Sequence, residues 1–329
     1  MSFMAEAMIS RGYAPSLEDS LVVVPGYASL LVQLKTKDGI ALSNTTISVK
    51  DGSTYYNYTS NEKGMCQYTL NSGYANIYVS NSIGGKTYQD ISPTWMNIDL
   101  PVGTKKVVNF VHNEPTFYQA NSSQTINLIR THMINLHIVG GGGGGGWGDW
   151  DREDGFTYYT IGAGGGAGYM NTWSNYELEK GSYSFIAGTG GRGGYRPNSN
   201  SLLNGATGGT SYISGTEFSA AGGGGAGSMY SHGGNAWAGI GGLGNGGGRN
   251  DANYYALAPT RGNVTFAGGG GGHAYVNNGY GNLFGGNATV PPTNGTRGGG
   301  GGGAPSSTSN RNLSGGWGGN GVLRINFLT

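Results

Sequence analysis

The chain has 329 residues, of which 69 are glycine and only 11% are charged, and its formal net charge is +1. This near-neutral balance offers no electrostatic attraction for nucleic acid or for an acidic membrane surface. The 22 tyrosines and 6 tryptophans argue against a disordered chain, because disordered low-complexity segments lack groups worth burying. The single cysteine, Cys66, excludes an intramolecular disulfide framework and is expected to lie buried in a strand.

The N-terminal segment, residues 1–25, carries a short apolar stretch from Met4 to Ile9, which Gly12 and Pro15 follow. It lacks the basic start and the cleavage site of a secretory signal, and no stretch of the sequence reaches the ~18 apolar residues of a membrane helix. One or two helical turns are marginal alone and need a surface to pack on. We expect either an attachment arm that docks on a partner or a helix that packs on its own domain.

Residues 26–112 are predicted to form a small β-sandwich. Apolar residues recur at every second position, at Leu30, Val32 and Leu34, at Ile47 and Val49, and at Ile77 and Val79, and turn signals separate these stretches. Alternation with a period of two and a turn signal every ten residues or so is typical of sandwich domains.

The order of these pieces resembles the Cna-B and carboxypeptidase regulatory-like modules. The matching stretches are Lys37–Leu42, before the Ile47 strand, and Ser60–Gly64, before the Tyr68 strand. The resemblance implies a prealbumin-like sandwich that serves as a stalk, a spacer or a sugar-binding platform. Isopeptide-forming members need a lysine, an asparagine and an acid buried together; no such triplet can be assigned here, so the bond is not predicted.

Residues 113–329 hold nearly all the long glycine runs, including seven consecutive glycines at Gly140–Gly146 and six at Gly298–Gly303. A flexible linker would carry serine and charge between its glycines, whereas aromatic residues follow these runs. A phosphate-binding loop is disfavoured because no G-K-[ST] motif occurs and no run lies between a parallel strand and a helix.

The remaining interpretation is a bundle of polyglycine II helices. Such a helix has about three residues per turn and no internal hydrogen bonds, so its N–H and C=O groups must pair with neighbouring chains. Apolar stretches such as Met133–Val139 and Gly321–Phe327 are expected to frame the bundle as β-strands. The glycines expected to form this scaffold include Gly140, Gly143, Gly146, Gly223, Gly269, Gly272, Gly298 and Gly301. The predicted fold class is therefore all-β: an N-terminal prealbumin/Ig-like sandwich followed by a glycine-rich polyglycine II domain.

This arrangement resembles two glycine-rich families. One includes the receptor-recognising tail-fibre adhesins of T-even-like phages. The other is the glycine-rich module of the anaplastic lymphoma kinase ectodomain and of phage and bacterial surface proteins. The second resemblance rests on Val139-Gly140, Ala163–Gly168, Gly205–Ser211, Ala220–Gly222 and the closing strand. The receptor module is disulfide-rich and secreted, whereas this chain has one cysteine and no secretory signal, which implies a virion protein assembled in a host cytoplasm.

No metal, cofactor or catalytic residue is predicted. Asp149, Asp151 and Glu153 alternate like the opening of a calcium loop, but Thr160 stands where that loop needs a bidentate glutamate, which favours a solvated loop. The five histidines lack zinc spacing, and no nucleophile elbow occurs. Two Arg-Gly-Gly segments, the first at Arg192, are too few to indicate RNA binding by a neutral chain.

Aromatic residues surrounded by asparagine and serine lie between the glycine runs, and this composition is typical of adaptable recognition loops. They either contact a host cell-surface protein or glycan, or cap the glycine bundle, which has no side-chain core of its own. The candidates for receptor contact are Trp147, Trp150, Tyr158, Tyr159, Tyr195, Tyr230, Trp237, Tyr254, Tyr255, Tyr275 and Tyr280.

These observations predict a structural virion protein of a tailed phage, either a tail-fibre tip or a host-receptor-binding protein. The arm would contact other virion proteins, the sandwich would act as a spacer, and the loops would contact the cell surface. The alternative is a capsid decoration or head-fibre protein with assembly contacts only. An enzyme such as a glycan depolymerase has the least support, because no paired carboxylates can be assigned. We expect a homo-oligomer, and analogy with other fibres indicates a trimer.

Overall fold

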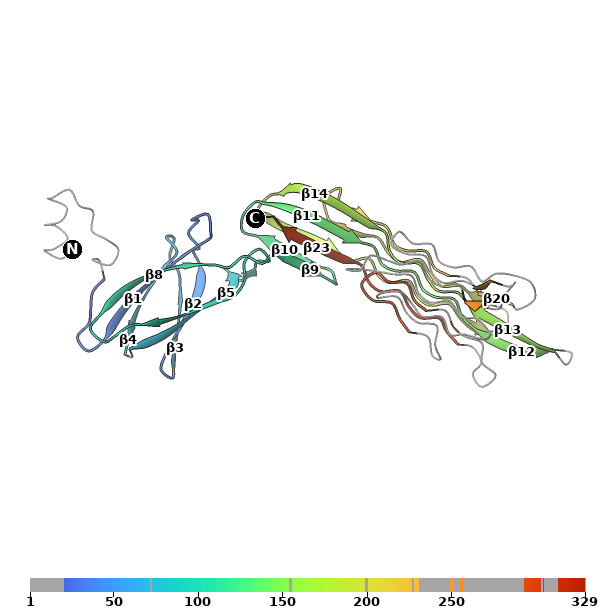
Figure 1. The fold of residues 1–329 in the computed structure, drawn as a ribbon, viewed down its shortest axis with the longest axis horizontal. Helices are drawn as coiled ribbons and strands as arrows, with labels where there is room; N and C mark the ends of the chain where they lie inside the picture. Colours follow the sequence, from blue (N-terminus) through green and yellow to red (C-terminus); the bar gives the residue numbers. More distant parts are fainter. Residues whose placement is uncertain are drawn as a thin grey trace. The chain divides into compact units, whose positions relative to one another are not determined.

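The computed structural model describes residues 21–328 apart from 72, 154–155, 199–200, 227, 231–248, 251–254, 257–292, 303 and 305–312. Every regular element in this part of the chain is a β-strand, which confirms the predicted all-β class. None of the described residues belongs to a helix that could span a bilayer. Contacts within the chain define two compact units, and the ribbon in Figure 1 is coloured along the sequence so that both can be followed.

The N-terminal unit comprises residues 1–116 with the short segments 127–131 and 179–181. Its β-sandwich has a three-stranded sheet in the order β4-β1-β8, in which β1 runs parallel to β8. In the second sheet β2 lies between β3 and β5, and β5 also pairs with β6 and β7. The strands of the unit are β1 (Ala28–Lys35), β2 (Thr45–Asp51), β3 (Thr54–Thr59), β4 (Met65–Leu70), β5 (Tyr74–Ile83), β6 (Lys86–Thr87), β7 (Thr94–Asp99) and β8 (Lys105–Val111).

The core of the sandwich is formed by the alternating apolar residues that the sequence pattern identified. Val32 on β1, Val49 on β2 and Ile77 on β5 are fully buried in one hydrophobic cluster. The buried hydroxyl of Tyr68 donates to the backbone oxygen of Ile47 at 2.7 Å, so its one polar group is satisfied. Cys66 is a free, buried thiol in this cluster, as predicted, and burial raises its pKa.

The glycine-rich unit comprises residues 117–126, 132–178 and 182–329. Two four-stranded sheets, in the orders β14-β11-β23-β9 and β10-β15-β18-β19, frame one end of its glycine runs. Their strands are β9 (Phe117–Ala120), β10 (Gln124–Leu128), β11 (His132–Val139), β14 (Met170–Leu178), β15 (Gly181–Ile186), β18 (Ser211–Ile213), β19 (Ser219–Ala220) and β23 (Val322–Phe327). We call these two sheets the end sheets.

The end sheets carry large apolar side chains, whereas the buried apolar side chains of the described runs are alanines such as Ala163 and Ala226. Ile134, Leu136 and Ile138 on β11 are fully buried. Strand β11 pairs antiparallel with β23, from Ile134 opposite Phe327 to Val139 opposite Val322. β11 then enters the first glycine run directly at Gly140. The predicted framing of the runs by strands 133–139 and 321–327 is therefore confirmed.

The first run, residues 140–146, lies at the centre of the bundle, and we call it the central run. Its successive N–H groups donate to three neighbouring runs in turn, residues 163–169, 206–209 and 316–319, with N···O distances of 2.8–2.9 Å. Each neighbour is reached again after three residues, which is the period of a polyproline II-type helix. The order of the partners shows that these three runs are antiparallel to the central run.

Carbonyl groups of the central run accept from three further runs, residues 191–194, 223–226 and 301–304, at 2.7–2.9 Å. These three runs are parallel to the central run. All six neighbours therefore bond to the same seven glycines, and parallel and antiparallel runs alternate around them. Side-chain-free backbones alone can approach on all sides in this way.

The six outer runs also bond to each other and close a ring around the central run. Each contact in the ring is made by two or three backbone hydrogen bonds, and again the donors are three residues apart. In order around the ring the runs are residues 162–169, 221–226, 205–209, 188–194, 315–321 and 298–304, the last of which bonds back to the first. The bundle is thus a hexagonal array of backbone helices.

His112, on the N-terminal unit, is a buried titratable group with one hydrogen bond. Its Nδ1 donates to the backbone oxygen of Ser92 at 3.1 Å, while its buried Nε2 has no partner among the described residues. Burial lowers the pKa of His112 from its usual range, because a proton on Nε2 would add an unpaired charge to a desolvated site. The folded N-terminal unit therefore binds this proton less readily than the unfolded chain.

This burial predicts that the N-terminal unit loses stability as the pH falls through the unfolded pKa of histidine, about 6.5, toward the lower folded value. The His112→Gln variant keeps a side-chain donor and cannot titrate. We expect its unfolding free energy, from urea titration at about pH 7.5 and about pH 5.5, to depend less on pH than that of the parent. An equal pH dependence in both proteins would contradict a neutral, buried His112.

Candidate functional site

Two pairs of runs lead away from the end sheets and back to them. From β11 the central run leads into residues 147–161 and the chain returns through 162–169 to β14. From β15 the run 188–194 leads into residues 195–204, and the chain returns through 205–209 to β18. Because all four strands belong to the end sheets, both connections lie at the opposite end of the bundle.

Two further segments join these connections. Strand β20 (Ser228–Tyr230), which follows the parallel run 221–226, pairs with β13 (Phe156–Gly162). Leu313, which precedes the run 315–321, forms a bridge with Gly148. We call these four segments, residues 147–162, 195–204, 228–230 and 313, the tip. Figure 1 shows β12, β13 and β20 together, at the far end of the runs from β11, β14 and β23.

The tip is built from short antiparallel hairpins. Strand β12 (Asp149–Glu153) pairs with β13, and β16 (Tyr195–Asn198) pairs with β17 (Ser201–Leu203). The sequence pattern at Asp149, Asp151 and Glu153 favoured a solvated loop, whereas the structure places these residues in a hairpin strand paired with Phe156–Thr160, because Tyr, Thr and Trp fit a pleated strand. A hairpin satisfies its own backbone and can extend beyond the bundle that supports it.

The structure brings several of the predicted contact residues together at the tip. Trp150 on β12 stands opposite Tyr159 on β13, and Tyr158 stands opposite Asp151. Tyr230 on β20 stands opposite Thr160. Four of the aromatic candidates thus occupy three neighbouring strands of one small sheet.

Trp147 lies in the tip but does not present a surface. Its side chain is only 1% exposed, although it was a candidate for receptor contact. Trp147 is the first side chain after seven glycines, so the end of the central run has no other group of its own to exclude water. The sequence left two roles open for the aromatic residues, receptor contact and capping of the bundle. Because Trp147 is buried, it caps the bundle, and its prediction as a receptor-contact residue is corrected.

Tyr195 begins the β16–β17 hairpin and is half-buried. The guanidinium carbon of Arg192 lies 3.9 Å from the centroid of the Tyr195 ring, which is cation–π geometry. Arg192 therefore belongs to the surface of the run beside the tip, and the Arg-Gly-Gly sequence around it is part of the bundle.

Of the remaining candidate residues, Tyr255 lies in the described part of the chain. Tyr255 pairs with Asn250 in the short ladder of β21 (Arg249–Asn250) and β22 (Tyr255–Ala256). The others lie outside the described residues: Trp237, Tyr254, Tyr275, Tyr280, Gly269 and Gly272.

The described scaffold candidates all lie in the bundle. A Cβ atom on Gly140, Gly143, Gly223 or Gly301 would lie far inside van der Waals contact of a backbone oxygen in a neighbouring run. Gly146 donates to the backbone oxygen of Ala163 at 2.8 Å, and the carbonyl of Gly298 accepts from Gly168 at 2.8 Å. These glycines are required because backbones, not side chains, meet at the centre.

Side chains on the outer runs follow a period of three that sequence reasoning missed. In the runs 188–194 and 315–321, exposed or half-buried side chains recur at every third residue, and glycine fills the two positions between them. In the run 205–209, which lies next to 188–194, Asn204, Thr207 and Thr210 have the same spacing and are exposed, and Ala206 is exposed as well. The three outward ridges are Thr189, Arg192 and Tyr195; Asn204, Thr207 and Thr210; and Ser314, Trp317 and Asn320. The signal was the Gly-Gly-x repeat in residues 189–195 and 314–320.

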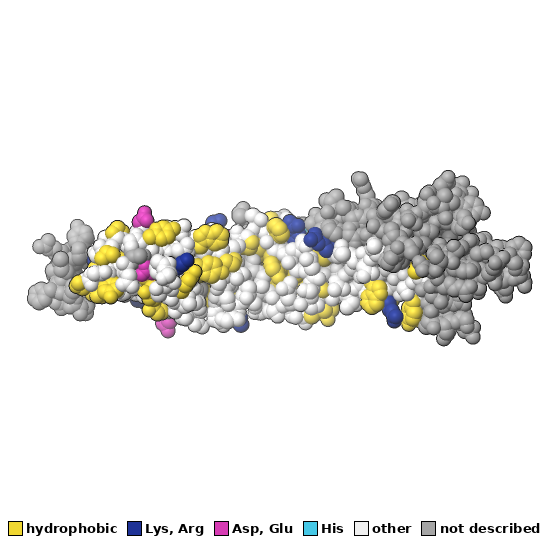
Figure 2. Space-filling view, turned by 90° about the horizontal axis from the view of Figure 1, so that it is seen from below, with side chains coloured by type: hydrophobic (Ala, Val, Ile, Leu, Met, Phe, Trp, Pro, Cys, Tyr) yellow, Lys and Arg dark blue, Asp and Glu magenta, His cyan; other side chains and the backbone are white. Residues whose placement is uncertain are grey.

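Few charges accompany these ridges. On the face drawn in Figure 2, the described part of the glycine-rich unit is mostly backbone and uncharged polar side chain, with scattered hydrophobic and basic groups. Among the described residues, no group of three or more His, Cys, Asp and Glu could hold a metal ion. His137 lies on β11 in the end sheets, where burial and then the charge of Arg324 lower its pKa.

Comparison with protein-family models matches residues 120–328 to a family described as a glycine-rich domain. Comparison with curated protein sequences gives no match. Among solved structures, the chain is similar to a Bacteroides uniformis protein proposed to bind carbohydrate, at 10% identity and a TM-score of 0.22, over 35% of this chain and 60% of that one.

Two other solved structures are similar to parts of the chain. The Bacillus anthracis TIE protein is 9% identical with a TM-score of 0.24, over 65% of this chain and 45% of that one. A streptococcal ancillary pilin is 8% identical with a TM-score of 0.23, over 58% of this chain and 60% of that one. The chain thus spans between 45% and 60% of the length of these three structures.

The period of three predicts opposite outcomes for substitutions at neighbouring positions of one outer run. Thr207 faces outward, so Thr207→Lys should change the unfolding free energy by no more than about 0.5 kcal/mol. A Cβ on Gly208 would overlap the backbone oxygen of Gly141, so Gly208→Ala should cost about 3 kcal/mol or more. Urea unfolding followed by circular dichroism measures both, with Gly73→Ala as the control, because a Cβ there meets nothing within 4 Å. Equal effects of Thr207→Lys and Gly208→Ala would contradict the assigned faces.

Proposed function

Since the chain belongs to the glycine-rich domain family, we propose that it is a structural virion protein of a tailed phage that presents a host-recognition surface at the tip. The position proposed for it is the end of a tail fibre or another receptor-binding site on the virion surface. One observation carries the proposal: in the described part of the chain, the connections from β11 to β14 and from β15 to β18 both leave the end sheets and return to them, so their hairpins gather at one end of the bundle.

The bundle suits this role because its interior is made of backbone. Every peptide group of the central run bonds to a neighbour through its N–H, and most also do so through the C=O, so the runs hold one another in fixed positions. Side chains are then needed only on the outside and at the ends. The tip can therefore vary in sequence without any change in the packing that supports it.

Composition supports recognition at the tip. Trp150, Tyr158, Tyr159 and Tyr230 lie on paired strands there, and tyrosine and tryptophan provide large contact areas at low cost in side-chain entropy. The ligand class we propose is a host cell-surface protein or glycan. We assign no catalytic role to the chain.

The other parts receive supporting roles in this proposal. The sandwich acts as a spacer of the Cna-B or carboxypeptidase regulatory-like type. Residues 1–25 act as the arm that attaches the chain to other virion proteins; residues 1–20 of it lie outside the described residues. By analogy with other fibres, the assembly is a trimer.

Removal of the β12–β13 hairpin tests recognition at the tip. In the variant, an Asn-Gly turn replaces residues 149–161, which removes three aromatic candidates and leaves the runs on both sides intact. We expect virions that carry this variant to adsorb to host cells at least about tenfold more slowly, a loss of about 1.4 kcal/mol of binding free energy. Thr207→Lys, on the side of the bundle, is the matched control and should leave adsorption unchanged.

The amount of each variant in purified virions is measured by immunoblotting, so that failed assembly is not mistaken for failed recognition. Unchanged adsorption by virions with a normal content of the hairpin variant would contradict a recognition role for the hairpin. Antibody labelling in electron micrographs locates the protein on the particle. Label on the capsid instead of the tail would favour a decoration or head-fibre protein with assembly contacts only.

A further inference from the structure

The N-terminal sandwich exposes large aromatic side chains on the outer face of its second sheet. Trp95 is 69% exposed, Tyr55 64% and Tyr78 41%, whereas Val49 and Ile77 on the inner face of the same sheet are fully buried. A cluster of exposed aromatic residues on one surface is unusual for a monomeric protein and marks a contact site. We call the outward residues Tyr55, Tyr74, Asn76, Tyr78, Trp95 and Asn97 the aromatic face.

Strand register places these residues side by side. Trp95 on β7 stands directly opposite Tyr78 on β5, and Asn97 stands opposite Asn76. Directly opposed residues of an antiparallel pair share one face of the sheet. With strands ~4.8 Å apart, the distance from β3 to β7 across β2 and β5 is ~14 Å, and Tyr74 and Tyr78 are ~13 Å apart along β5. The face is thus large enough for a few sugar rings.

The centre of the aromatic face is polar. Asn76 Nδ2 donates to Asn97 Oδ1 at 2.6 Å, and each amide has two N–H donors and an acceptor oxygen, so this bond leaves capacity for others. The aromatic rings of Tyr74, Tyr78 and Trp95 lie on positions around this pair. Protein–protein interfaces have the reverse arrangement, with an apolar centre and a polar rim. The arrangement therefore favours a ligand that combines apolar surface with many hydroxyl groups.

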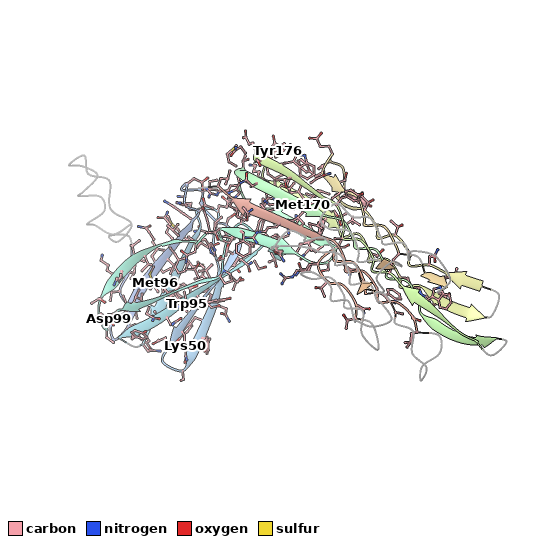
Figure 3. The ribbon with its side chains drawn as sticks, turned by 45° about the vertical axis from the view of Figure 1, so that its right-hand side comes forward. Lys50, Trp95, Met96, Asp99, Met170 and Tyr176 are labelled. Carbon is pink, nitrogen blue, oxygen red and sulfur yellow. The ribbon has the colours of Figure 1, made fainter. Side chains whose placement is uncertain are left out.

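Charge on this side of the sheet is balanced. The charged side chains at the outward positions of β2, β3, β5 and β7 are Lys50 and Asp99. Lys50 Nζ lies 5.3 Å from the centroid of the Tyr55 ring, and Asp99 stands opposite Tyr74. Figure 3 labels Lys50, Trp95 and Asp99 on this sheet. One positive and one negative group select against a strongly charged ligand and are compatible with a neutral one.

We propose that the aromatic face binds a neutral glycan. Sugar rings stack by their C–H faces on Trp95 and Tyr78, and their hydroxyl groups bond to the amides of Asn76 and Asn97. This site lies on the N-terminal unit and is separate from the tip. Glycan binding by the aromatic face does not require any particular position of the protein in a virion, so it can be tested independently of the proposed function.

Affinity electrophoresis of the full chain tests this proposal. The protein is run through native gels that contain dextran, yeast mannan, galactomannan or, as an acidic probe, alginate. We expect retardation by at least one neutral polysaccharide and a larger effect than with alginate. Trp95→Ala and Tyr78→Ala should each weaken that retardation at least about tenfold, because stacking residues dominate such contacts. Trp317→Ala, which removes an exposed tryptophan of the glycine-rich unit, is the matched control and should leave it unchanged.

Light scattering and thermal unfolding of the same variants complete the test. Since Trp95 and Tyr78 are exposed, both variants should keep the parent's melting temperature and oligomeric state. Three results would overturn the proposal: no retardation by any neutral polysaccharide, retardation that Trp95→Ala leaves intact, or equal loss in Trp317→Ala. Dissociation of an oligomer by Trp95→Ala would also overturn it, because the face would then be a contact between copies of the chain.

Discussion

The structure depends on one constraint: a polyglycine II helix makes no hydrogen bonds within itself. Each of its N–H and C=O groups must find a partner in another run, or remain unsatisfied at a cost of about 1–3 kcal/mol when buried. The central run meets this requirement by donating to three antiparallel runs and accepting from three parallel runs. Because the directions of the runs alternate, the connections between successive runs lie at the ends of the bundle, and the hairpins of the tip are connections at one of these ends.

The same constraint makes the bundle cooperative. Ordering a glycine costs roughly 0.5–1 kcal/mol more than ordering an alanine, so no run is stable alone. The runs 205–209 and 315–321 are far apart in sequence, yet both accept from residues 140–146. The end sheets contribute the hydrophobic burial that the runs cannot supply, since β11 and β23 are continuous with the first and last runs.

Sequence patterns were sufficient for the fold but only partly for the site. Alternation around Leu30–Leu34 identified the sandwich, and the strand–run junction at Val139-Gly140 identified the framed bundle. The burial of Trp147 could not be predicted, because the role of the first side chain after a run depends on how seven runs end together. The outward ridges were predictable from the Gly-Gly-x repeat. The aromatic face was not, because alternation shows only that residues such as Tyr78 and Trp95 point away from a core, and their alignment depends on register.

The central claim is that the glycines form a hydrogen-bonded scaffold, and amide hydrogen exchange tests it most directly. Measured on the full chain by NMR, the amide protons of residues 140–146 should exchange only when the glycine-rich unit opens as a whole, because each N–H donates within the bundle. Their protection should match that of the buried strand β11. Exchange at the rate of an unstructured peptide would show a flexible linker and contradict the account.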